Sequence, residues 1–85
     1  SVSPNAIDCA LEFIRFADYN SWQVYFVAPG KNGDVLVELI GENGLAAEIY
    51  FNPDCSKELL IYQGDDCLYE GEFNPEIISK YFNGV

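Results

Sequence analysis

Five short runs of strand-forming residues follow one another through the middle of the chain, separated by turn-rich gaps of three to six residues. Parallel strands need crossovers of a dozen or more residues, which gaps this short cannot supply. The spacing therefore predicts an antiparallel meander, in which each strand pairs with the next. The expected strands are Trp22–Val27, Asp34–Ile40, Leu45–Phe51, Lys57–Gln63 and Cys67–Phe73.

Helices are predicted at both ends of this meander. Ser3 is a good N-cap and Pro4 suits the first position of a helix that should end near 18–20. Asn74 is expected to cap a second, short helix, and Gly84 lies just past its end. Apolar residues recur at helical spacing along the first helix and define its expected buried stripe: Ile7, Leu11, Ile14 and Ala17, broadened by Phe13 and Phe16.

These elements predict an α+β fold formed by a single domain over residues 1–85. The N-terminal helix is expected to pack on one face of a five-stranded antiparallel meander sheet, beside the short C-terminal helix. A chain of 85 residues can build only one modest core. That core needs the apolar side chains of all five strands on one face of the sheet.

Three-residue loops at 42–44, 53–55 and 64–66 set a register that places apolar side chains on one face of the sheet and the glutamates on the other. Other loop lengths would bury unpaired glutamates among apolar residues. The loop 53–55 carries Cys55 where a glycine is expected. Trp22 is expected in the core or at its rim. The predicted core face holds Val35, Val37, Leu39, Leu45, Ala47, Ile49, Phe51, Leu59, Ile61, Cys67, Tyr69 and Phe73, with Cys9 on the helix beside it.

The same register predicts an acidic opposite face. Glu38 should lie directly across from Glu48, and Glu58 should lie between Tyr50 and Glu72. Opposed like charges on neighbouring strands are destabilising. The whole face is expected to hold Leu36, Glu38, Ile40, Ala46, Glu48, Tyr50, Glu58, Leu60, Tyr62, Leu68, Glu70 and Glu72. It is interpreted either as a solvated face that keeps the protein soluble or as a docking surface for a cationic partner.

Composition excludes several classes of function. The chain has 4 Lys and Arg against 14 Asp and Glu, for a net charge of −10, so it cannot neutralise a nucleic-acid backbone. It has no histidine, the commonest general base and metal ligand. No enzymatic activity, catalytic residue, metal or cofactor is predicted. Membrane binding is not expected either, because no apolar run reaches the length of a membrane span. Three cysteines without paired spacing favour free thiols and a cytoplasmic location.

These observations lead to two hypotheses of function. The first is an interaction module, of the kind that immunity and antitoxin proteins represent, that binds a basic protein partner through its acidic sheet face. The alternative is a binder of a small cationic or aromatic ligand, held between the first helix and the sheet near Phe13, Trp22 or Tyr69. The expected partner-binding residues are Glu38, Glu48, Tyr50, Glu58, Tyr62, Glu70 and Glu72.

A homodimer is also predicted, because a two-layer domain leaves apolar residues of the outer face uncovered. Direct contact between two acidic faces would bring like charges together. Self-association is therefore expected along the row Ile40, Tyr62 and Leu68, or at an open edge of the sheet.

Four segments give the chain a resemblance to known sequences. They are residues 10–13 (Ala-Leu-Glu-Phe), the turn 32–35 (Asn-Gly-Asp-Val), residues 48–54 (Glu-Ile-Tyr-Phe-Asn-Pro-Asp) and residues 70–73 (Glu-Gly-Glu-Phe). On these segments the chain resembles short uncharacterised bacterial proteins with a helix and a β-meander, of the kind found on mobile gene cassettes. Cys55 departs from the Asn-Pro-Asp-Gly turn usual in that group. The resemblance implies a fold but no assigned activity or functional residue.

Overall fold

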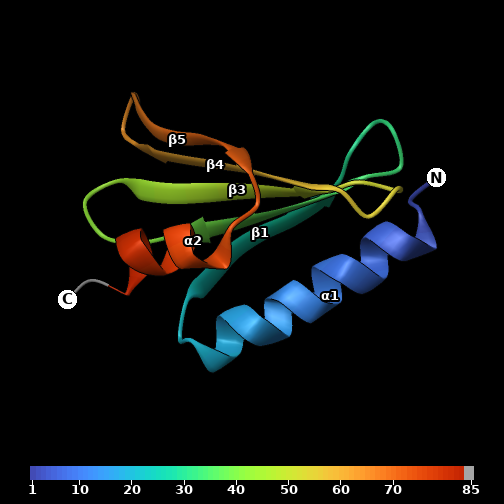
Figure 1. Cartoon of the computed structure of the whole chain (residues 1–85), viewed down its shortest axis with the longest axis horizontal. Coiled ribbons are helices and arrows are strands. Elements are labelled where there is room, and N and C mark those ends of the chain that lie inside the picture. Colours follow the sequence, from blue (N-terminus) through green and yellow to red (C-terminus); the bar gives the residue numbers. More distant parts are fainter. Residues whose placement is uncertain (84–85) are drawn as a thin grey trace.

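A computed structural model describes residues 1–83 as two helices packed on one face of a single sheet (Figure 1). The strands follow one another across the sheet in the order β1-β2-β3-β4-β5, each antiparallel to its neighbours. This confirms the predicted helix-plus-meander architecture. The elements are α1 (Pro4–Tyr19), β1 (Gln23–Pro29), β2 (Val35–Ile40), β3 (Leu45–Phe51), β4 (Lys57–Gln63), β5 (Asp66–Glu72) and α2 (Pro75–Phe82).

The helix ends lie close to their predicted positions. Asn74 caps α2 as expected, since its side chain accepts a hydrogen bond from the backbone N–H of Glu76. Ser3 occupies the N-cap of α1, but its side chain makes no capping hydrogen bond. The Ser3 backbone N–H instead donates to the carbonyl of Gly33 at 2.9 Å, which ties the start of α1 to the β1–β2 turn. The expected role of Gly84 lies outside the described residues.

Helix α1 is rotated relative to the predicted apolar stripe. Its buried side chains are Ala6, Ala10, Phe13 and Ala17, whereas Ile7 is exposed. The small alanines let the helix backbone approach the sheet closely, and Phe13 supplies most of the bulk at the contact. The Phe13 ring lies 5.6 Å from that of Phe51, measured between centroids. Leu11 and Phe16, also expected in the stripe, are exposed as well.

The first strand begins one residue later than predicted and runs two residues further. Trp22 precedes β1, is 5% exposed, and lies in the core as expected. Its indole Nε1 donates to the Asn83 side-chain oxygen at 2.6 Å, which holds the end of α2 against the end of α1. Strand β1 pairs with β2 through a bulge between Val24 and Phe26. A bulge inserts an extra residue into one strand and changes which of its side chains face the core. A prediction that assumes strict alternation of residue types therefore misses it.

The last hairpin corrects the prediction for Cys67. Gln63 pairs with Asp66, so the turn has two residues, and its first, Gly64, has φ +58° as a type II′ turn requires. A bulge after Ile61 then restores the expected pairing of Ile61 with Tyr69. Cys67, expected in the core, is exposed because the bulge places it across from Tyr62. The predicted pairs between the bulge and the end of β5 are unchanged.

Candidate functional site

The outer face of the sheet, away from both helices, carries the acidic residues in the predicted register. Glu38 pairs with Glu48 across β2 and β3. Tyr50 pairs with Glu58, which pairs in turn with Glu72. We use the term acidic face for the seven side chains that this register brings together: Glu38, Glu48, Tyr50, Glu58, Tyr62, Glu70 and Glu72. All seven expected partner-binding residues therefore share one surface.

Tyrosine hydroxyls relieve the repulsion in the centre of the acidic face. The Tyr62 hydroxyl donates to Glu38 at 2.8 Å and lies 3.3 Å from an oxygen of Glu48. The Tyr50 hydroxyl donates to the other oxygen of Glu48 at 2.8 Å. The opposed carboxylates are thus held by neutral donors rather than by cations. This network was not predicted, although the diagonal position of Tyr62 relative to Glu48 across β3 and β4 is a signal for it.

Both tyrosines keep their protons far above neutral pH. Burial and the hydrogen bond to Glu48 raise the pKa of Tyr50 to about 12. The hydrogen bond to Glu38, followed by burial, raises the pKa of Tyr62 further. Each phenol therefore remains a hydrogen-bond donor to the neighbouring carboxylates at physiological pH.

The other part of the acidic face surrounds an open hollow of about 660 Å³ over β4 and β5. Glu58, Glu70 and Glu72 are exposed at its rim, and Tyr50 and Leu60 line it as half-buried side chains. Asn52 donates to Glu58 at 3.3 Å. The hollow combines exposed carboxylates with apolar surface, an arrangement suited to the stem and charged head of a Lys or Arg side chain.

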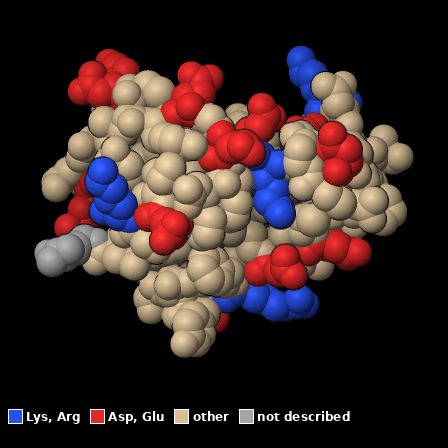
Figure 2. All heavy atoms as spheres, in the orientation of Figure 1, with Lys and Arg blue, Asp and Glu red and all other residues tan. Residues whose placement is uncertain are grey.

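The four cations of the chain lie away from the acidic face. Arg15 is on α1, Lys31 is in the β1–β2 turn and Lys80 is on α2. Lys57 belongs to β4 but pairs with the inward-facing Phe51, and its ammonium group lies 5.7 Å from the centre of the Phe73 ring. Figure 2 shows acidic side chains along the upper side of the molecule, where β4 and β5 run in Figure 1.

The residues expected to mediate self-association differ in accessibility. Leu68 is 37% exposed, whereas Ile40 and Tyr62 are half-buried. The largest exposed apolar side chains of the sheet lie instead on β1, an edge strand, where Tyr25 is 64% exposed and Val27 is 49% exposed. This apolar edge was not predicted, because the bulge at Tyr25 interrupts the alternation of side chains along β1.

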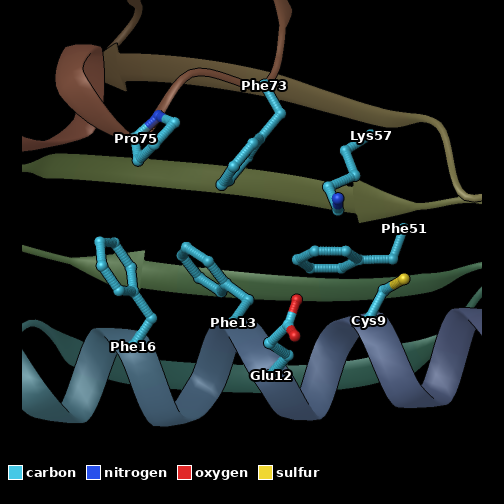
Figure 3. A pocket seen from close by; sticks show the side chains of 8 residues that line it. All are labelled: Cys9, Glu12, Phe13, Phe16, Phe51, Lys57, Phe73 and Pro75. Carbon is cyan, nitrogen blue, oxygen red and sulfur yellow. The ribbon is translucent and has the colours of Figure 1, made fainter.

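A second concavity lies between α1 and the sheet, with a volume of about 260 Å³ (Figure 3). Phe13 lines it as expected, together with the rings of Phe16, Phe51 and Phe73, while Glu12 and Lys57 also border it. Its volume is slightly below the range of about 300–1,000 Å³ typical of ligand sites. Trp22, also proposed for such a pocket, lines a separate concavity of about 330 Å³ between α1 and β1, with Ile14 and Val24. Tyr69, the third residue proposed, lines neither of the two.

No family model matches the chain, and no significantly similar relative was found among curated proteins or solved structures.

The similarity to cassette-encoded proteins therefore stays a prediction, and any functional argument depends on the geometry of the described residues. Over residues 1–83, no group of three or more Cys, Asp or Glu side chains is arranged to hold a metal ion. In the same part of the chain, neither helix has the length and apolar character needed to cross a membrane.

Proposed function

We propose that this protein is a non-enzymatic interaction module that binds a basic protein through its acidic face, as immunity and antitoxin proteins bind their partners. The observation that carries the proposal is the hollow bordered by Glu58, Glu70 and Glu72, on a face that the four cations of the chain avoid. A face kept acidic only for solubility does not need carboxylates gathered around a concave, partly apolar surface.

The spacing of these carboxylates makes them act together. Neighbouring strands lie about 4.8 Å apart, well inside the Debye length of about 8 Å at physiological salt. Their fields therefore add, and attract a basic partner before contact. After contact, Leu60 and Tyr50 supply apolar and aromatic surface in the hollow. The sheet fixes the backbone of the residues around the hollow, which limits the conformational entropy lost on binding.

The proposed attraction makes association sensitive to salt. A candidate partner is first captured on the immobilised protein and purified, and its on-rate is then measured at about 50 mM and about 300 mM salt. We expect the on-rate to fall roughly tenfold or more at the higher salt concentration, while the off-rate changes less. An on-rate that is independent of salt would reject the electrostatic mechanism.

The alternative function, binding of a small cationic or aromatic ligand between α1 and the sheet, has less support. Two concavities lie there, with volumes of about 260 Å³ and 330 Å³, near the lower end of the range typical of ligand sites. The aromatic walls of the smaller one also belong to the core, since Phe13 and Phe51 are buried. The acidic face has the larger hollow and more groups free to interact.

We also propose that the protein forms a homodimer through the open edge of β1. This strand has no charged residue over Gln23–Pro29, and it presents Tyr25, Phe26 and Val27 as exposed side chains. Two highly acidic copies repel each other least where their neutral surfaces meet. Edge strands are commonly protected from pairing by charged side chains, which β1 lacks.

Sedimentation at tens of micromolar protein tests the dimer. We expect a dimer for the unmodified chain and a monomer for Val27→Lys, because the lysine places a charge at the paired edge. Leu68→Glu, in the exposed part of the outer-face row, should leave the dimer intact. Loss of the dimer in Leu68→Glu alone would instead favour the row through Ile40 and Tyr62. A monomeric unmodified protein would exclude both surfaces.

A further inference from the structure

The N-terminal end of α1 and the β3–β4 turn lie against each other at one end of the molecule (Figure 1). Gly33, in the β1–β2 turn, lies between them. A Cβ atom added to Gly33 would lie 3.3 Å from the Pro53 ring and 3.4 Å from the carbonyl oxygen of Ser1. The start of the chain, the β1–β2 turn and the β3–β4 turn are therefore packed together.

This packing brings two cysteines from distant parts of the sequence near each other. Cys9 is half-buried and points from α1 toward the strands, next to Phe51 and Lys57 (Figure 3). Those two residues flank the turn that carries Cys55, which is exposed. Cys55 contributes to the raised pKa of Cys9, so the two side chains lie near each other.

The turn that carries Cys55 has a fixed conformation. The backbone N–H of Asn52 donates to Ser56 at 2.9 Å, and that of Cys55 donates back to Asn52 at 3.0 Å. The Asp54 carboxylate also accepts hydrogen bonds from the backbone and hydroxyl of Ser56. Cys55 has φ +72°, in the left-handed region that favours glycine. A cysteine in place of the preferred glycine therefore costs stability in the reduced protein, which a role for its thiol would explain.

We propose that Cys9 and Cys55 form a reversible disulfide that locks α1 to the β3–β4 turn when the protein meets an oxidising small disulfide such as oxidised glutathione. This proposal is independent of the binding function proposed above. Two protein thiols and one glutathione disulfide give one protein disulfide and two glutathione thiols. Two electrons pass to glutathione, and the protons of the protein thiols end on the departing thiolates.

The surroundings of the two thiols indicate the order of the steps. Cys55 is exposed, so its thiolate attacks the small disulfide first and expels one glutathione thiolate. Burial, and then the neighbouring Cys55, raise the pKa of Cys9, which keeps Cys9 mostly protonated at neutral pH. The minor thiolate form of Cys9 then attacks the sulfur of Cys55 in the mixed disulfide and expels the second glutathione thiolate.

The third cysteine provides an internal control. Cys67 lies across from Tyr62, near the end of β4 that is opposite Lys57 and the β3–β4 turn. It is exposed, so small disulfides reach it as readily as Cys55. Its distance from the other two thiols leaves it able to form a mixed disulfide with glutathione but no bond within the chain.

The full chain is equilibrated in glutathione buffers from fully reduced to fully oxidised, the remaining thiols are alkylated, and peptides are mapped by mass spectrometry. We expect a peptide linking Cys9 to Cys55 in oxidising buffers. Closing a loop of roughly 45 residues restricts the unfolded chain, so the Tm should rise by about 10 °C or more on oxidation. Reductant should reverse the rise. Cys55→Ser and Cys9→Ser should lack it, and Cys67→Ser should retain it.

Two results would overturn the proposal. One is the absence of the linked peptide at every glutathione ratio. The other is a rise in Tm on oxidation that persists in Cys55→Ser, which would assign the effect to other chemistry. Because both serine variants are compared with their own reduced forms, a change in basal stability does not obscure either result.

Discussion

Replacing Tyr62 with phenylalanine is expected to lower the free energy of unfolding by about 2 kcal/mol, which corresponds to a fall in Tm of roughly 10 °C. The substitution removes one hydroxyl and leaves the ring in place. That hydroxyl donates to Glu38 at 2.8 Å and lies 3.3 Å from Glu48. Without it, two opposed and half-buried carboxylates lose a shared donor, while Glu48 keeps the hydrogen bond from Tyr50.

Two comparisons assign this loss to the hydrogen bonds. Tyr19→Phe removes a hydroxyl from an exposed residue on α1 and should change stability by less than about 0.5 kcal/mol. In a Glu38→Gln background, Tyr62→Phe should cost less, because the residue left without the donor is neutral. The free energy of unfolding is measured by urea denaturation for each substitution. Equal losses for Tyr62→Phe alone, for Tyr19→Phe and for Tyr62→Phe in the Glu38→Gln background would show that the tyrosine network does not stabilise the face.

Neutralising the rim of the hollow should slow association with the basic partner by roughly tenfold at low salt. The variant replaces Glu58, Glu70 and Glu72 with glutamine, which removes three charges and preserves the size of the side chains. The three residues are exposed, so the fold should not need their charge. The remaining carboxylates of the acidic face stay paired with tyrosines.

A matched variant separates this local effect from net charge. Asp8→Asn, Asp18→Asn and Glu42→Gln remove three charges from exposed residues of α1 and the β2–β3 turn. We expect this control to slow association by less than about threefold, because its charges lie on α1 and in the β2–β3 turn and none of them borders the hollow over β4 and β5. Equal slowing by the two variants would mean that total charge, rather than the acidic face, attracts the partner.

Much of the fold follows from local patterns in the chain. The strands alternate strictly enough that any other register would bury glutamates, so the pairing of Glu38 with Glu48 is predictable. The rotation of α1 is not, because Ile7 and Ala6 occupy neighbouring positions and only the shape of the sheet decides which one is buried. The exposure of Cys67 is not predictable either. The two-residue turn and the bulge in β5 decide which way its side chain faces, and they outweigh its apolar character.

The candidate site was only partly predictable. Its glutamates follow from the register, but the hydrogen bonds of Tyr50 and Tyr62 depend on side-chain conformations, which sequence spacing leaves open. The proximity of Cys9 and Cys55 depends on how closely α1 packs against the β3–β4 turn. Both features depend on tertiary packing, and both occur where a local preference is overridden. The tyrosine network lies at opposed like charges, and Cys55 is a left-handed residue that is not glycine.

The central claim is that the outer face of the sheet is the binding surface, and the chemical shifts of the bound protein test it most directly. Amide signals of the isotopically labelled chain are assigned and then compared without and with the captured basic partner. We predict that the largest changes fall on β4 and β5, at Glu58, Glu70 and Glu72 and at Leu60 between them. Changes confined to α1 or to the edge of β1, with those amides unmoved, would contradict the proposed function.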